Sequence, residues 1–264
     1  MKIGFSSTCA WNLSPTRSIA HARELGIYSF ELWFDHYVFH DESVGKIRKA
    51  LRENEIVATV HASSWDINIT STSKPVREFS IEQVKKSIDL AEAIAAPLIT
   101  VHPGKKSFFR ARRDEIAKAQ QEAFHTLFCY SEGKDVMICV ENIEDTGRDV
   151  MVTEADFIDF FSKIDDDLFI TLDVAHLGDL QSIEMFYSKL GESIRHIHIS
   201  DLNQEELHVP MGDGILQTEA VLSLLKDTYR GIFSLEFYQD DPSGNEVFNS
   251  VEYLKALGEK LDYP

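Results

Sequence analysis

Histidine and carboxylate residues recur at the ends of short apolar segments along this sequence. Imidazole and carboxylate side chains bind divalent metal ions, and they also transfer protons during catalysis. Six of them stand at or beside the last residue of a β-type segment: His61, His102, Glu141, Asp173, His198 and Glu236. The pattern therefore predicts a metal-dependent active site, provided that the fold brings these six segment ends together.

Two neighbouring pairs extend this set. His176 follows Asp173 in Asp-Val-Ala-His, so one loop presents two ligand-type groups. One residue separates Glu206 from His208. Alternate side chains of an extended segment point the same way, so Glu206 and His208 can bind one ion. We therefore predict nine ligands for Zn²⁺, Mn²⁺ or a similar ion: His61, His102, Glu141, Asp173, His176, His198, Glu206, His208 and Glu236. Five histidines match no segment end and are interpreted as structural: His21, His36, His40, His125 and His196.

Short β-type segments alternate with longer amphipathic ones from end to end. The predicted strands are Lys2–Ser6, Tyr28–Phe34, Ile56–His61, Pro97–His102, Val136–Glu141, Leu168–Asp173, Ile194–Ser200 and Ile232–Phe237. Eight strands that alternate with helices imply a parallel sheet, and a closed barrel pairs them all without leaving an edge. We predict an α/β fold, a single (β/α)8 TIM barrel over residues 1–264, with a doubly wound open sheet as the alternative. Barrels carry their chemistry at the C-terminal ends of the strands, where the six residues lie.

Helix signals support this alternation. Apolar residues recur near the 3.6-residue helical period over Ile81–Ala95. Patterns typical of helix starts precede the first, third and fifth helices: Ser14-Pro15, Ser80-Ile81-Glu82-Gln83 and Thr153-Glu154-Ala155-Asp156.

Length and composition limit the class of protein. The 264 residues match the roughly 250 of one barrel domain. No apolar run approaches the ~20 residues that span a bilayer, so no membrane partner is expected. The N-terminus lacks the apolar segment of a signal peptide, and the three cysteines show no CxxC spacing, which together favour the reducing cytoplasm. The net charge of −18 argues against a nucleic-acid partner without excluding one, because bound cations can reverse the local field.

One basic cluster stands out in this acidic chain. Five of the 26 basic residues fall within residues 105–113, directly after His102-Pro-Gly. Their charge-assisted hydrogen bonds suit a phosphate or carboxylate, although a solvated loop and helix start is an equal alternative. From this cluster we predict three substrate-binding residues: Lys105, Lys106 and Arg110.

Six motifs carry a resemblance that covers most of the chain. They are Thr100-Val-His-Pro-Gly104, Val140-Glu-Asn142, Leu172-Asp-Val-Ala-His176, His196-Ile-His-Ile-Ser-Asp201, His208-Val-Pro-Met-Gly-Asp-Gly214 and Leu235-Glu-Phe237. As a set they resemble the xylose-isomerase-like barrel superfamily. That superfamily includes sugar isomerases and epimerases, and also AP endonucleases of the endonuclease IV type.

The resemblance implies one to three divalent ions per chain. In the isomerase and epimerase branch, residues matching Glu141, Asp173, His198 and Glu236 would hold one ion, and Glu141 and Glu236 would also transfer protons. In the endonuclease branch, three zinc ions would be held. The first would bind His61, His102 and Glu141, the second the four residues above, and the third His176, Glu206 and His208. Glu206 departs from the aspartate expected there, and Gly4-Phe-Ser-Ser-Thr8 lacks the histidine of the nuclease first strand.

These observations favour a metal-dependent isomerase or epimerase that acts on a small sugar or sugar phosphate through an enediolate-type proton transfer. The alternative is a multinuclear zinc phosphodiesterase of the endonuclease IV type. A second alternative is a non-catalytic barrel that binds a sugar or a metal. The sequence does not predict an oligomeric state.

Overall fold

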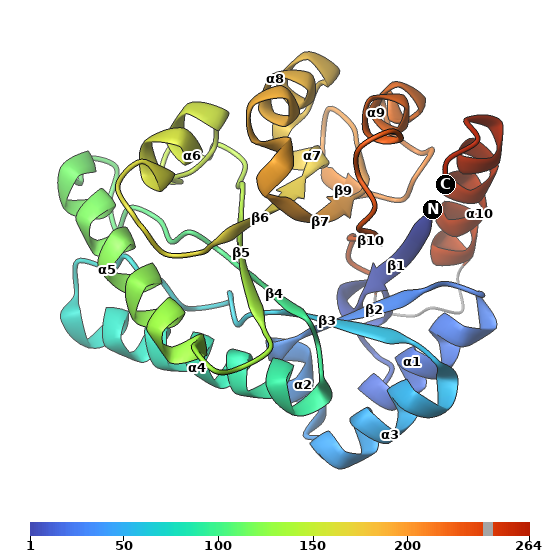
Figure 1. Cartoon of the computed structure of the whole chain (residues 1–264), viewed down its shortest axis with the longest axis horizontal. Helices are drawn as coiled ribbons and strands as arrows, with labels where there is room; N and C mark the ends of the chain where they lie inside the picture. The colour runs from blue at the N-terminus through green and yellow to red at the C-terminus, as the bar shows by residue number, and fades with distance from the viewer. Residues whose placement is uncertain (240–244) are drawn as a thin grey trace.

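Eight parallel strands close into a barrel, in the order β1-β10-β7-β6-β5-β4-β3-β2 (Figure 1). The computed structural model describes residues 1–239 and 245–264. The barrel strands are β1 (Lys2–Ser6), β2 (Ser29–Trp33), β3 (Val57–His61), β4 (Leu98–Val101), β5 (Met137–Glu141), β6 (Phe169–Asp173), β7 (Ile194–Ile199) and β10 (Ile232–Leu235). This closure confirms the predicted TIM barrel and rules out the open sheet, because β1 pairs with both β2 and β10.

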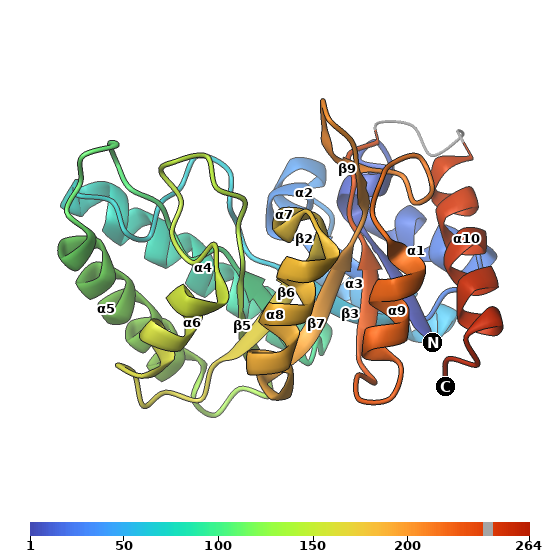
Figure 2. The ribbon, with the colours of Figure 1, turned by 90° about the horizontal axis from the view of Figure 1, so that it is seen from above.

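Helices cover the outside of the barrel. The main ones are α1 (Pro15–Glu24), α3 (Val44–Asn54), α4 (Lys74–Ile94), α5 (Arg113–Ser131), α6 (Glu154–Phe161), α8 (Leu180–Leu190), α9 (Thr218–Leu225) and α10 (Glu246–Lys260). Shorter elements follow the strands: η1 (Ser7–Ala10), α2 (Phe34–His40), α7 (Val174–Leu177), η2 (Gly191–Ser193) and the hairpin of β8 (Asp201–Leu202) and β9 (Leu207–Val209). Figure 2 shows α2, α7 and this hairpin on one side of the molecule, with both termini toward the other. Within the described residues, none of the helices combines the length and the apolar character needed to cross a membrane.

The apolar core lies between strands and helices, whereas the barrel interior is polar. Successive strand residues face opposite sides. Residues such as Leu32, Val60 and Ile99 therefore pack in the apolar core with the helices. Many of the intervening positions hold fully buried polar residues, among them Glu31, Thr59, Thr100, Thr171 and His196. The helices thus supply the hydrophobic stabilisation, and the interior is left to hold polar groups.

Two predicted helix starts are confirmed and one is wrong. Pro15 begins α1, and Thr153 and Asp156 form a capping box at the start of α6. The third helix begins at Lys74 rather than near Ser80. Ser80 lies inside α4, where its hydroxyl donates to the Val76 carbonyl at 2.7 Å and accepts from the Asn68 N–H at 2.8 Å. The serine therefore fastens the preceding loop to the helix instead of capping it.

Barrel closure depends on a close approach at Gly4. A Cβ at this position would lie 2.5 Å from the Ser29 hydroxyl and 2.8 Å from the Ser29 carbonyl, on the neighbouring strand. We expect Gly4→Ala to lower the free energy of unfolding by about 1–3 kcal/mol, because β1 and β2 must move apart. The control is Gly45→Ala in α3, where an added Cβ meets no atom within 4 Å. Urea unfolding checks both variants, and equal loss in the two would contradict this explanation.

Candidate metal centre

Four predicted ligands meet where β5, β6, β7 and β10 end. Glu141 and Asp173 are the last residues of β5 and β6, His198 lies near the end of β7, and Glu236 directly follows β10. All four are buried, and their ligand atoms lie within 4.8 Å of one another. Nδ1 of His198 lies 2.8 Å from Oε1 of Glu141, 2.5 Å from Oε2 of Glu236 and 3.9 Å from Oδ2 of Asp173. We call these residues the four-ligand group.

The four-ligand group fits a divalent cation. It places three carboxylates around one imidazole in the interior, and an unpaired buried charge is costly. Oδ2 of Asp173 is buried without a hydrogen-bond partner among the described residues, and Oε2 of Glu236 is buried with the ion-pair contact to His198 but no well-aligned hydrogen bond there. A bound cation would satisfy both oxygens and offset the negative charge. The mixed nitrogen and oxygen ligands suit zinc, manganese and related ions.

Two further ligand groups adjoin the first and share its carboxylates. Oε2 of Glu141 lies 3.4 Å from Nε2 of His61 and 3.0 Å from Nε2 of His102, while Oε1 faces His198. Asp173 forms the other group with His176 and His208. Glu141 and Asp173 can therefore each bridge two ions.

His176 and His208 are held in place by hydrogen bonds from their other nitrogens. Nδ1 of His176 lies 2.7 Å from the Asn142 carbonyl, which can only accept, so this Nδ1 carries the hydrogen. Once the ring loses its second proton, as metal binding requires, the lone pair is on Nε2, which lies 3.0 Å from Nε2 of His208. Nδ1 of His208 bonds the Ser200 hydroxyl at 3.0 Å. The two rings thus turn their Nε2 atoms toward each other, as a shared ion would require.

The structure does not bring Glu206 into these groups. Its side chain is exposed on the β8–β9 hairpin, and its backbone N–H bonds Oδ1 of Asn203. Asp173 takes its place beside His176 and His208. Glu144, which the sequence analysis did not single out, has Oε2 3.3 Å from Nε2 of His176. Eight of the nine predicted ligands therefore converge.

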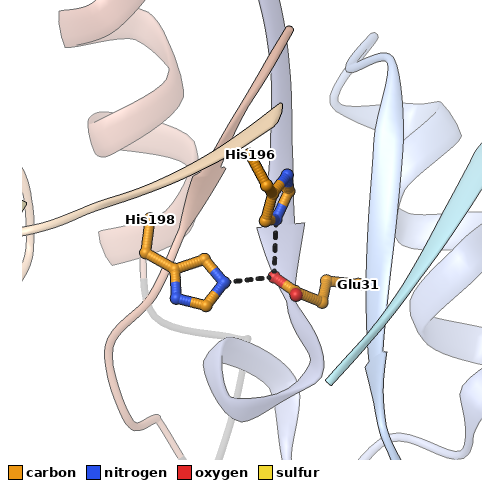
Figure 3. Close-up of side chains that lie close together, drawn as sticks. All are labelled: Glu31, His196 and His198. Carbon is orange, nitrogen blue, oxygen red and sulfur yellow. Dashed lines mark hydrogen bonds and ion pairs between the residues drawn. The ribbon is translucent and has the colours of Figure 1, made fainter. Parts of the chain in front are cut away.

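Sequence reasoning also missed Glu31, and it assigned His196 a structural role. Figure 3 shows Glu31 of β2 between His196 and His198 of β7. Glu31 and His196 lie in mid-strand, so a search of strand ends could not find them. The alternation His-Ile-His, together with a glutamate inside the apolar segment Phe-Glu-Leu-Trp, was the available signal. The other four histidines left out of the site do not occur in the ligand groups found among the described residues.

Burial and mutual charge set the protonation of the metal-free site. Burial alone would lower the pKa of His198, but the carboxylates of Glu236, Glu31 and Glu141 outweigh it and raise that pKa well above its usual value. Burial alone would raise the pKa of Glu141, but His198 and His102 hold it well below its usual value. A proton therefore sits on His198 rather than on Glu141, and a metal ion must displace the hydrogen on Nδ1 to bind.

The three predicted substrate-binding residues lie in different surroundings. Lys105 lines a cavity of about 230 Å³ together with Trp33, His102 and Glu144. Lys106 is tied to the loop after β5, because its backbone N–H donates to the Arg148 carbonyl at 2.8 Å. Arg110 is exposed, and it is not part of that cavity's lining. Of the three, Lys105 is therefore the one beside the ligand groups.

Comparison with known proteins agrees with this geometry. Residues 19–257 match the family described as xylose isomerase-like TIM barrel. The chain belongs to this family. Over 272 residues it is 26% identical to an uncharacterized protein of Methanocaldococcus jannaschii, covering 97% of this chain and 99% of that protein. It is 25% identical to a probable endonuclease 4 of Mycoplasmopsis agalactiae, covering 71% and 70% of the two chains.

The family fold is also that of solved structures. One is a D-tagatose 3-epimerase-like protein, with a TM-score of 0.85 and 24% sequence identity over 99% of this chain and 98% of that one. The xylose isomerase-like fold is thus shared over nearly the whole chain.

The His176 imidazole gives a pH-dependent stability. Burial alone would lower its pKa, but Asp173, Glu141, Glu144 and the Asn142 carbonyl raise it to about 9. A raised histidine pKa stabilises the folded, metal-free protein fully below about pH 6.5, and this contribution is lost as the pH rises through about 9. We expect the free energy of unfolding of the wild type to exceed that of His176→Gln by on the order of 2–3 kcal/mol at pH 6. The difference should shrink at pH 9.5.

Urea unfolding of both metal-free proteins at the two pH values provides the measurement. Comparison with the variant removes the contribution of other titrating groups that the two proteins share. A difference that stays constant between the two pH values would show that His176 does not carry this proton.

Proposed function

We propose that this protein is a divalent-metal-dependent isomerase or epimerase that acts on a sugar or sugar phosphate. The observation that carries the proposal is the placement of Glu141 and Glu236. They come from β5 and β10, yet both reach Nδ1 of His198, at 2.8 and 2.5 Å. A substrate bound at the four-ligand group would therefore lie beside two carboxylates. Moving a proton on a sugar carbon needs such a pair, one group to take the proton and one to return it.

The protonation of the two carboxylates suits this role. Burial alone would raise the pKa of Glu236, but His198 outweighs it and lowers that pKa below its usual value. Glu141 is shifted in the same direction. Both are therefore ionised at neutral pH and can accept a proton from the carbon beside a carbonyl. A divalent ion in the four-ligand group would supply Lewis acidity toward that carbonyl and the adjacent hydroxyl.

The surroundings of the site favour a small substrate. The cavity beside His102 measures about 230 Å³ and includes Lys105, whose ammonium group suits a phosphate or carboxylate. The similarity to the D-tagatose 3-epimerase-like structure also supports sugar chemistry. The net charge of −18 works against binding a nucleic-acid backbone.

A second candidate is phosphodiester hydrolysis by a metal cluster. It is favoured by the three ligand groups, which share Glu141 and Asp173 and could hold up to three ions. The similarity to a probable endonuclease 4 points the same way. The number of bound ions therefore separates the two candidates.

The proposed reaction can be tested by hydrogen exchange. Metal-replete enzyme incubated with ketoses and their phosphates in deuterated water should place deuterium beside the carbonyl or yield an epimer. We expect Glu236→Gln to slow this exchange by about 10²–10⁴-fold, because it removes one proton-transfer group. Glu206→Gln serves as the control and should retain activity, since Glu206 lies outside the ligand groups. Elemental analysis should find about one ion per chain.

Two or three ions per chain, no exchange with any sugar, and metal-dependent nicking of abasic DNA would instead establish the second candidate. Protein that holds no ion after incubation with excess divalent metal would refute both candidate functions.

A separate test addresses the basic loop. If the substrate is anionic, Lys105→Gln should raise KM for a sugar phosphate by about tenfold and leave KM for the neutral sugar nearly unchanged, because only the anion loses a charge-assisted bond. Lys106→Gln and Arg110→Gln, made in parallel, report whether the rest of the predicted cluster takes part. Equal changes in KM for charged and neutral sugars would exclude Lys105 as the anion-binding residue.

A further inference from the structure

Glu31 contacts the ring nitrogen of His198 that does not face Glu141 and Glu236. Figure 3 shows Glu31 with His196 and His198. The side chains of Glu31, His196 and His198 are all fully buried. Oε2 of Glu31 lies 3.2 Å from Nε2 of His196 and 3.0 Å from Nε2 of His198. β2 and β7 are separated in the barrel by β1 and β10, so these contacts cross the interior rather than joining adjacent strands.

The contact with Glu31 determines which nitrogen of His198 carries its hydrogen. An ionised carboxylate accepts hydrogen bonds and cannot donate them, so Nε2 of His198 must be protonated. In the metal-free protein Nδ1 also carries hydrogen, because it too faces carboxylates. When a metal ion displaces that hydrogen, Glu31 keeps the remaining one on Nε2, and the lone pair lies on Nδ1. This same Nδ1 faces Glu141 and Glu236.

We propose that Glu31 is a positioning residue, which fixes the Nε2–H tautomer of His198 and thereby presents Nδ1 to the metal ion. Carboxylates behind ligand histidines orient the ring in this way and increase its basicity. The inference rests on the metal site of the proposed function, but it does not depend on which reaction that site catalyses.

The rest of the environment fits a hydrogen-bonded carboxylate. His196 donates to the same oxygen as His198, and the Thr100 hydroxyl lies 3.4 Å from the other oxygen. Both oxygens of Glu31 therefore meet donors, as a buried carboxylate requires. Thr100 is in turn 2.8 Å from the Thr171 hydroxyl.

An ion held directly by Glu31, His196 and His198 is the competing arrangement, since their ligand atoms also lie close together. His198 would then have to ligate through Nε2. If its Nδ1 also bound an ion in the four-ligand group, the ring would have to lose its only proton. The hydrogen-bonded arrangement needs no such loss, and it lets the two groups share His198.

The test compares zinc affinity in a graded series at position 31. Glu31→Gln keeps a weaker, neutral acceptor, whereas Glu31→Leu removes the acceptor. We expect zinc affinity, measured by competition with a chromophoric chelator, to fall about 10–100-fold in Glu31→Leu. The affinity of Glu31→Gln should lie between those of wild type and Glu31→Leu. The matched control is Thr59→Val, a barrel-interior change at a buried hydroxyl with no hydrogen-bond partner among the described residues. It should bind zinc as wild type does.

Nitrogen-15 NMR of zinc-loaded wild type tests the tautomer directly and needs no variant to fold. The expected result is hydrogen on Nε2 of His198 and zinc on Nδ1. Hydrogen on Nδ1, unchanged zinc affinity in Glu31→Leu, or loss of one whole ion per chain in both Glu31 variants would each overturn the proposal. Wild type that binds no zinc, manganese or cobalt would instead refute the proposed function. Zinc binding that is indifferent to Glu31 would remove only the positioning role.

Discussion

Buried negative charge is the constraint on which the site depends. Glu31, Glu141, Asp173 and Glu236 are all buried in or directly above the barrel interior. A carboxylate in such a place is tolerated only when charges and hydrogen-bond donors surround it. Imidazoles supply those donors in the metal-free protein, and a divalent cation would replace part of their positive charge. The abundance of histidine around these carboxylates follows from this requirement as much as from catalysis.

The register of the barrel strands places His198 beside these buried carboxylates. Asp173 pairs directly with His198 across β6 and β7, and His198 pairs with Ser234 two residues before Glu236. Because parallel strands alternate their side chains in step, one correct register places several ligands at the same level. His198 is the common member, since it meets Glu31 through one nitrogen and the four-ligand group through the other. Apolar packing between the strands and the surrounding helices stabilises that register.

The sequence predicts the barrel well because its signals are local. Strand and helix periodicity depend on neighbouring residues, and the strand ends fix which carboxylates and histidines converge. Glu31 was missed because its importance depends on contacts across the barrel with β7, and the spacing of residues along β2 alone does not predict those contacts. Glu206 was misplaced for a related reason. The two-residue alternation with His208 assumes an extended backbone, but His208 has a φ of +59°, which turns the chain and breaks the alternation.

His208, with its left-handed backbone, is positioned differently from the residues of the four-ligand group. The four-ligand group stands on strand ends or directly beside them, where the barrel fixes each position. His208 instead lies on a hairpin, in a conformation that costs a non-glycine residue on the order of 1 kcal/mol or more. Its loop is braced by Asp201, whose carboxylate accepts from the backbone N–H groups of Gly212 and Leu216 at 3.1 and 2.8 Å. The ligand group that contains His208 therefore depends on loop geometry, whereas the group of His61, His102 and Glu141 stands on strand ends or directly after them. The chemistry of an ion held in the four-ligand group would depend on the barrel itself, so the same strands could support either reaction.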